Sequence, residues 1–219
     1  MAEPEKKRIF MSMVIPMLLV LALWVIKATD TLFDLDLNRF GLIPLSGRGA
    51  IGIVTSPLLH ADWSHLFANS IPLLILGTLL FYFYRDIAWM ILGLIYLITG
   101  VWVWTFARGN GIHIGASGIV YGLVSFLFFS GIIRREKSTM VITVLVAFLY
   151  GGLIWGLFPQ LFPRQPISWE SHLMGLLAGL ILALYYRRQG PQKNEHDWGE
   201  EDSEEDPPDA YWKKGTENQ

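Results

Sequence analysis

The chain contains no cysteine among its 219 residues, which excludes a disulfide, a thiol nucleophile and a thiolate metal site. Charge is also scarce, because only 16% of the residues are charged, compared with about 25% in an average soluble domain. Hydrophobic residues make up 53% of the chain. This composition predicts a polytopic membrane protein. Its spanning segments should be helices, because a segment in lipid must satisfy its own backbone hydrogen bonds.

The charges are divided unevenly along the chain. Residues 1–190 carry 14 basic and 9 acidic side chains, whereas residues 191–219 carry 3 basic and 10 acidic ones. The acidic stretch has too little apolar content to form a core. We therefore predict a disordered tail over residues 189–219, with a partner-binding motif around Tyr211 and Trp212 as the alternative.

Six apolar segments come within a few residues of the roughly 20 that a spanning helix needs. They cover residues 9–26, 65–84, 87–106, 116–133, 140–158 and 171–186. A secretory signal is the alternative for the first segment, but no A-x-A-like cleavage site follows it. We predict an all-α membrane domain of six transmembrane helices over residues 9–188, after a short basic N-terminus over residues 1–8. The long loop over residues 27–64 should be partly structured and partly embedded in the membrane.

The loops that share a side with the N-terminus are richer in positive charge. With the N-terminus in the cytoplasm, the inner loops hold nine basic residues and the outer loops hold five. The nine inner residues are Lys6, Lys7, Arg8, Arg85, Arg134, Arg135, Lys137, Arg187 and Arg188. The positive-inside rule then places both termini in the cytoplasm. It also brings the starts of the second, fourth and sixth segments to the outer face.

Strong hydrogen-bonding side chains are rare inside these segments, and four of them fall at the same predicted depth. His65 and Asn69 lie one turn apart on the second segment, Ser117 begins the fourth, and His172 begins the sixth. Each has a purely structural explanation: a serine can cap a helix, and buried histidine or asparagine can tie helices together. Their common depth favours a functional site, because polar groups in a membrane usually mark one.

The residue types suit acyl transfer. A serine hydroxyl needs a base to accept its proton, and His172 is the candidate base for Ser117. The segments contain no interior carboxylate, so the pair is predicted to work as a dyad. His65, Asn69 and the free backbone N–H of Ser117 at the helix start are candidate donors to an oxyanion.

Small residues accompany both dyad members. Gly118 and Gly122 form one small-xxx-small stripe, and Gly175 and Gly179 form another. Facing stripes allow two helices to approach closely, which a direct Ser–His hydrogen bond requires, although ordinary helix packing would use the same glycines. Tyr121 lies one turn along from the serine and is placed to pack on the imidazole.

Three stretches carry a resemblance to a known family: HADWSHLFAN over residues 60–69, GASGIVYG over 115–122 and SHLMGLLAG over 171–179. In this order, on the second, fourth and sixth segments, they resemble the rhomboid intramembrane serine proteases in their bacterial six-helix form. The resemblance implies that Ser117 is the nucleophile, His172 the base, and His65 and Asn69 the oxyanion hole. It also implies supporting roles for Tyr121 and for glycines such as Gly115.

The resemblance further implies a gate on the fifth segment, around Trp155 and Phe158, and a cap formed by residues 159–169. The chain departs from the family pattern in its first loop. Many members carry a Trp-Arg pair there, whereas Gly47, Arg48 and Gly49 stand in that region here.

The expected function is that of an intramembrane serine endopeptidase that cleaves transmembrane protein substrates near the outer face of the lipid bilayer. A catalytically silent relative that binds membrane proteins is the main alternative. A transporter or metal site has less support, because His60 and His65 are five residues apart and no H-E-x-x-H motif occurs. No cofactor, metal or nucleic acid is expected. The layout favours a prokaryotic plasma membrane.

Overall fold

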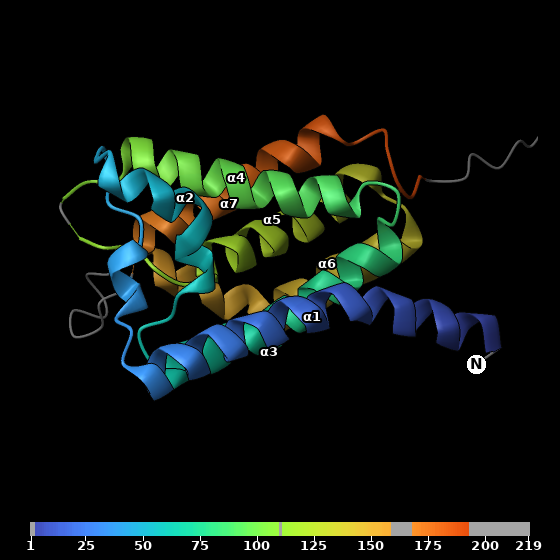
Figure 1. The fold of residues 1–219 in the computed structure, drawn as a ribbon. Coiled ribbons are helices and arrows are strands. Elements are labelled where there is room, and N and C mark those ends of the chain that lie inside the picture. The colour runs from blue at the N-terminus through green and yellow to red at the C-terminus, as the bar shows by residue number, and fades with distance from the viewer. Residues whose placement is uncertain (1–2, 110, 159–167, 193–219) are drawn as a thin grey trace, which may run out of the picture.

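The computed structural model describes residues 3–109, 111–158 and 168–192, and this part of the chain is all-helical. Six long apolar helices run through it (Figure 1). They are α1 (Glu3–Phe33), α3 (Trp63–Phe83), α4 (Ala88–Phe106), α5 (Ser117–Arg134), α6 (Lys137–Tyr150) and α7 (Trp169–Tyr185). Five are long and apolar enough to cross a membrane, counting α6 with the 3₁₀ segment that follows it, and α7 is an apolar helix of 17 residues. The predicted all-α polytopic fold is confirmed.

The first helix is longer than predicted. It continues through Lys27 to Phe33 because the lysine charge is compensated inside the fold. Lys27 Nζ lies 3.3 Å from Asp30 Oδ2 and donates to the carbonyl oxygen of Ala61 at 3.1 Å. At its N-terminal end, α1 begins at Glu3. Figure 1 shows α1 lying along α3 at one edge of the bundle.

The loop between α1 and α3 is partly structured, as predicted. It contains α2 (Gly52–Thr55) and three 3₁₀ turns, Leu37–Phe40, Arg48–Ile51 and Ser56–Leu58. The α2 turn packs on α4, where Gly100 leaves room for the backbone: a Cβ at that position would lie 2.8 Å from the carbonyl oxygen of Ile53. This contact keeps the loop close to the bundle.

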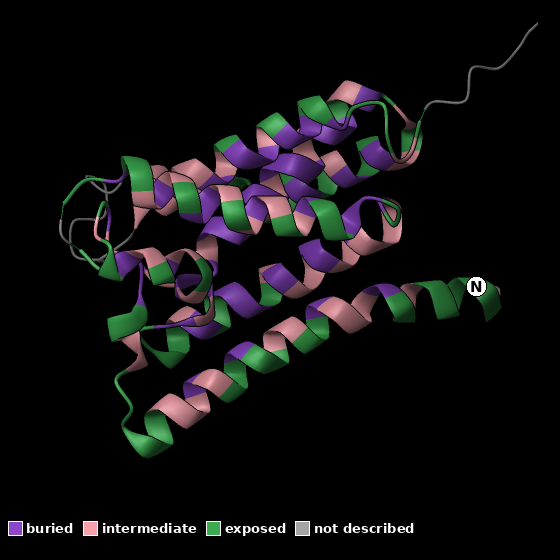
Figure 2. Cartoon of the chain, turned by 45° about the horizontal axis from the view of Figure 1, so that its top comes forward, coloured by how far each residue is buried: buried purple, intermediate pink, exposed green. Residues whose placement is uncertain are grey.

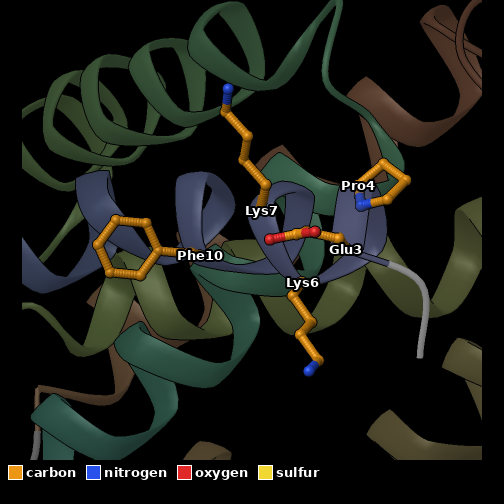
Figure 3. Close-up of a pocket in the computed structure, with 5 residues that line it drawn as sticks. All are labelled: Glu3, Pro4, Lys6, Lys7 and Phe10. Carbon is orange, nitrogen blue, oxygen red and sulfur yellow. The ribbon is translucent and has the colours of Figure 1, made fainter.

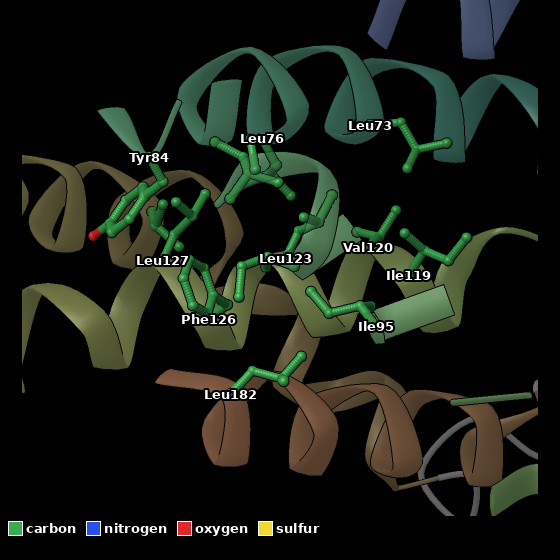
Figure 4. Close-up of a cluster of buried hydrophobic side chains, with 14 of the residues drawn as sticks. Leu73, Leu76, Tyr84, Ile95, Ile119, Val120, Leu123, Phe126, Leu127 and Leu182 are labelled. Atoms are coloured by element: carbon green, nitrogen blue, oxygen red, sulfur yellow. The ribbon is translucent and has the colours of Figure 1, made fainter. Parts of the chain in front are cut away.

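The α5 helix occupies the centre of the bundle (Figures 1 and 2). In its most apolar stretch 67% of the residues are buried, against 17–39% in the other four long apolar helices. The side chains of α5 interdigitate with those of α3, α4 and α7 (Figure 4). The cluster includes Leu73, Leu76, Tyr84, Ile95, Leu123, Phe126 and Leu182. The outer helices therefore expose much of their apolar surface, as helices facing lipid do.

The fifth apolar segment is not the single helix predicted over residues 140–158. α6 ends at Tyr150, and Gly151–Leu157 continues as a 3₁₀ helix. Gly151 and Gly152 stand at the change, and glycine is a weak helix former. Sequence hydropathy does not separate the two kinds of helix, since both read as one apolar run.

The starts of α3, α5 and α7 lie at one end of the bundle, together with the end of α1. Hydrogen bonds that involve side chains join them there, between Lys27 and Ala61, between Ala116 and His60, and between Ser117 and His172. The opposite end is tied by Arg8, which donates to Tyr82, and by Arg134, which donates to the carbonyl oxygens that end α7. Most of the predicted acidic tail, residues 193–219, lies outside the described residues.

Candidate active site

The first residue of α5 and the fourth residue of α7 meet at this end of the bundle. His172 Nε2 lies 2.9 Å from Ser117 Oγ, which is hydrogen-bonding distance. The residue at the cap position of α5 is Ala116, and Ser117 makes no capping hydrogen bond. The explanation of Ser117 as a helix cap is therefore wrong, and its hydroxyl is directed to the imidazole instead.

The two glycine stripes explain how the helices come so close. A Cβ on Gly175 would lie 2.0 Å from the carbonyl oxygen of Gly118, and a Cβ on Gly179 would lie 2.2 Å from that of Gly122. Real side-chain carbons do not approach an oxygen to those distances. The backbones of α5 and α7 thus touch directly, and the contact of Gly118 with Gly175 lies within one turn of the serine and the histidine.

The other nitrogen of His172 has a partner that sequence reasoning missed. His172 Nδ1 lies 3.0 Å from the carbonyl oxygen of Gly156, in the 3₁₀ segment after α6. A carbonyl oxygen only accepts, so this contact requires the proton to be on Nδ1. The neutral ring then has a free lone pair on Nε2, which faces Ser117 Oγ as a base must. A backbone carbonyl, which has no sequence signature, fills the position of the acid in a triad.

Tyr121 stacks on the imidazole. The two ring centroids are 4.2 Å apart and the rings are 7° from parallel. The Tyr121 hydroxyl donates to the carbonyl oxygen of Leu153, again in the 3₁₀ segment. A Cβ on Gly156 would lie 2.1 Å from the Tyr121 hydroxyl oxygen. Glycine at this position therefore lets the 3₁₀ segment lie close to both rings.

These features can be compared with known proteins. Residues 48–189 match the family model described as the Rhomboid domain. The chain belongs to the rhomboid family. It is similar to an uncharacterised protein of Mycobacterium tuberculosis, with 35% identity over 179 residues, 80% of this chain and 74% of the relative. An uncharacterised Mycobacterium leprae protein is 31% identical over 176 residues, 78% of this chain and 69% of the relative. RHOMBOID-like protein 5 of Arabidopsis thaliana is 29% identical over 133 residues, 57% of this chain and 40% of the relative.

Membership of the rhomboid family and the long apolar helices together make this an integral membrane protein. The matched region begins at Arg48, inside the first loop, and runs past the end of α7. It therefore includes the helices that carry the candidate site residues, which are α3, α5, α7 and the 3₁₀ segment after α6.

The two predicted oxyanion donors of this rhomboid differ in their surroundings. The ring of His65 packs on Gly115, whose φ of +109° and missing side chain suit glycine alone: a Cβ there would lie 2.5 Å from His65 Cε1. Asn69 is buried, and its Nδ2 donates to the carbonyl oxygen of His65 at 3.1 Å within α3. The histidine thus lies beside the segment that leads to Ser117, whereas the amide nitrogen of the asparagine is engaged by its own helix.

His60 contributes a contact that its place in the sequence does not reveal. Its Nε2 accepts the backbone N–H of Ala116 at 3.4 Å. Burial, reinforced by the neighbouring His65, lowers the pKa of His60 from 6.5 to about 4. The ring is therefore neutral at physiological pH, as an acceptor must be. The backbone N–H of Gly115, the residue before Ala116, donates to the carbonyl oxygen of Ser56 at 2.9 Å.

The backbone N–H groups of Ser117 and Gly118, the two residues after Ala116, have no acceptor among the described residues. They belong to the first turn of α5, where N–H groups lack partners within the helix. The positive end of the helix dipole adds to their attraction for negative charge. These two N–H groups, the His65 ring and the second N–H of the Asn69 amide are candidate donors to an oxyanion beside Ser117.

The predicted gate residues lie on the 3₁₀ segment and its end. Trp155 is 55% exposed and Phe158 is 45% exposed. Residues 159–167, which make up most of the cap predicted over residues 159–169, lie outside the described residues. Arg48 and Gly49 belong to a 3₁₀ turn in the first loop, where Gly49 packs against Ile43.

The described residues place no metal site at the dyad. Within residues 3–109, 111–158 and 168–192, no group of three or more His, Asp or Glu side chains is placed to hold a metal ion. A surface hollow of about 440 Å³ lies at the start of α1 (Figure 3). It is lined by Glu3, Pro4, Lys6, Lys7 and Phe10, at the end of α1 remote from Lys27 and hence from the dyad.

Proposed function

We propose that this rhomboid is an intramembrane serine endopeptidase in which Ser117 is the nucleophile and His172 the general base. The observation that carries the proposal is the hydrogen-bonded series from Ser117 Oγ through the His172 ring to the Gly156 carbonyl, with distances of 2.9 Å and 3.0 Å. A neutral imidazole held in this way is ready to take the serine proton. Its stacking on Tyr121 restricts the ring to one orientation.

In the first half of the reaction, Ser117 Oγ attacks the substrate carbonyl carbon while its proton passes to His172 Nε2. The resulting imidazolium is stabilised by the Gly156 carbonyl, which accepts a stronger hydrogen bond from a charged ring. The oxyanion accepts from the N–H groups of Ser117 and Gly118 and from the side chains of His65 and Asn69. His172 then gives its proton to the leaving amine as the peptide bond breaks.

In the second half, His172 takes a proton from water, and the hydroxide attacks the acyl-enzyme carbonyl. The same donors stabilise the second oxyanion. The bond from the carbonyl carbon to Ser117 Oγ breaks, and the serine regains its proton from His172. The reaction therefore needs a path for water to the starts of α5 and α7, but it needs no metal ion or organic cofactor.

The site should act on transmembrane segments at the outer face of the bilayer. Basic residues favour the loops on the side of the N-terminus, so both termini are proposed to be cytoplasmic and the dyad to lie near the opposite face. The bacterial relatives support a prokaryotic plasma membrane. A helical substrate hides its carbonyls in i to i−4 hydrogen bonds, so segments that unwind easily near the cut should be preferred.

The test is cleavage of a single-span substrate by the full-length protein in liposomes, together with labelling by a fluorophosphonate probe. Ser117→Ala and His172→Ala should each lower cleavage by at least about 1,000-fold and abolish labelling. Ser125→Ala is the matched control. It removes another serine hydroxyl of α5 that contacts α7, with Ser125 Oγ donating to the carbonyl oxygen of Leu176 at 2.7 Å.

The control should retain cleavage within a few-fold of wild type. Cleavage that survives in Ser117→Ala would show that another residue is the nucleophile. A wild type that folds, binds the substrate and neither cleaves nor reacts with the probe would identify a silent membrane-protein-binding relative instead.

A further inference from the structure

A second hydrogen-bonded group of side chains lies beside the dyad. His113 Nδ1 is 2.6 Å from Ser168 Oγ, and Ser168 Oγ is 2.7 Å from Ser171 Oγ. His113 lies in the segment that leads to α5, and the two serines lie at the start of α7. This group, the His113 latch, therefore links the two pieces of chain that carry Ser117 and His172.

The backbone of His113 is held by two hydrogen bonds to the first loop. The His113 N–H donates to the carbonyl oxygen of Leu42 at 2.8 Å, and the Leu42 N–H donates back at 3.0 Å. Leu42 is only 1% exposed and packs with Val103 and Ala107 of α4 and its end. The backbone of His113 is thus held to the first loop at Leu42, which packs on α4, and the imidazole is itself buried.

The serines of the latch are used in an unusual way. Ser168 occupies the cap position of α7, where a serine oxygen normally accepts an N–H of the first turn. Here its side chain makes no capping hydrogen bond and contacts His113 and Ser171 instead. The first turn of α7 therefore lacks a side-chain capping hydrogen bond, and Ser168 instead joins it to the segment before α5. His172 is the residue directly after Ser171.

We infer that His113, Ser168 and Ser171 are positioning residues that hold the first turn of α7 so that His172 stays in reach of Ser117. The inference rests on the proposed function. Below the dyad, the direct backbone contact of Gly118 with Gly175 sets the spacing of the two helices. Above it, Gly118 also lies close to the Ser171 carbonyl, which would be 3.1 Å from a Cβ at Gly118, and the latch adds a side-chain link from the segment before α5 to the same turn of α7. The dyad is therefore held from both sides.

The latch should affect the chemical step more than substrate binding. Its members contact neither Ser117 Oγ nor the His172 ring, so their loss leaves both reacting groups in place but less well aligned. A misplacement well under 1 Å weakens proton transfer, and the loss of one hydrogen bond to a partly buried partner corresponds to about a 5- to 10-fold change. We expect that fall in kcat, with KM within about 2-fold of wild type.

The test compares His113→Phe, which keeps an aromatic ring, with His113→Asn, whose amide can replace Nδ1. Ser168→Ala and the double variant His113→Phe/Ser168→Ala complete the set. Each full-length protein is reconstituted in liposomes, and kcat, KM and the rate of fluorophosphonate labelling are measured. His113→Phe and Ser168→Ala should each lower kcat and the labelling rate about 5- to 10-fold. His113→Asn should retain at least about half the activity, and the double variant should be no worse than the poorer single one.

Wild-type kcat in His113→Phe and Ser168→Ala would overturn the inference, as would His113→Asn being as poor as His113→Phe, or fully additive losses in the double variant. A purely structural role would lower the melting temperature without this rescue pattern. If His113→Phe does not fold, Ser168→Ala and Ser171→Ala decide the matter from the α7 side. An inactive wild type would refute the proposed function itself, whereas an active wild type with unaffected latch variants refutes only the latch.

Discussion

Replacing Gly175 by alanine tests whether the close approach of α5 and α7 sets the dyad. The new Cβ would lie 2.0 Å from the Gly118 carbonyl oxygen, whereas ordinary contact begins at 3.4 Å. The atom it meets is backbone, so the helices must separate by about 1.4 Å, the difference between these distances. The 2.9 Å contact between Ser117 Oγ and His172 Nε2 would then exceed hydrogen-bonding distance. A shift of about 1 Å costs roughly 100-fold in rate, and we expect that loss in kcat for Gly175→Ala.

The assay is the rate of fluorophosphonate labelling, which reports on the nucleophile directly, together with kcat on a transmembrane substrate. Gly93→Ala in α4 is the matched control, because nothing lies within 4 Å of the added Cβ. It should label at the wild-type rate. Labelling of a folded Gly175→Ala within about 3-fold of wild type would refute the reasoning, since the dyad would then tolerate a helix separation that its geometry forbids.

Three further variants address the rings of Tyr121 and His60 near the dyad. Tyr121→Phe keeps the stack on His172 but loses the hydrogen bond to the Leu153 carbonyl, so kcat should fall about 5-fold. Tyr121→Ala should lose more, and equal losses in the two variants would contradict a role for the stack. His60 binds a proton less readily in the folded protein, with a pKa of about 4 against 6.5, so the free energy of unfolding should decrease as pH falls through that window. His60→Gln keeps an acceptor for the Ala116 N–H and removes the titration, an effect of about 2 kcal/mol at pH 5. Melting temperatures in detergent between pH 7.5 and 4.5 should decrease less steeply for this variant, and identical slopes would contradict the prediction.

The sequence predicted the membrane fold well because its signals are local. Runs of apolar residues about 20 long are read directly from hydropathy, and the described chain carries a helix in each of the six. The predictions were weaker at the helix ends. Lys27 was expected to end the first helix, but the partners Asp30 and Ala61 allow a lysine to continue it. Gly151 was read as part of one long helix because hydropathy does not distinguish α from 3₁₀ geometry.

The candidate site divides in the same way. Ser117, His172 and the glycine stripes were recognisable because their residue types and spacing are themselves the signal. The Gly156 carbonyl that contacts His172 Nδ1 was not, because every residue has a carbonyl group and only the path of the chain decides where it points. The amide of Asn69 donates one of its two N–H hydrogens to the carbonyl of His65 in its own helix, which the sequence did not reveal, and its place in an oxyanion hole stays a prediction.

By itself, the sequence determined that this protein lies in a membrane, which segments form its apolar helices, and which serine and histidine are brought to one end. These properties follow from side-chain hydrophobicity and from periodic placement on helices, and both are local. Only the tertiary structure decided which backbone groups complete the site. It selected the Gly156 carbonyl as the partner of His172 and joined His113 to Ser168. It also engaged the amides of Gly115 and Ala116 and left those of Ser117 and Gly118 without an acceptor among the described residues. The physical reason is that backbone groups are identical along the chain, so packing alone determines which of them remain available for chemistry.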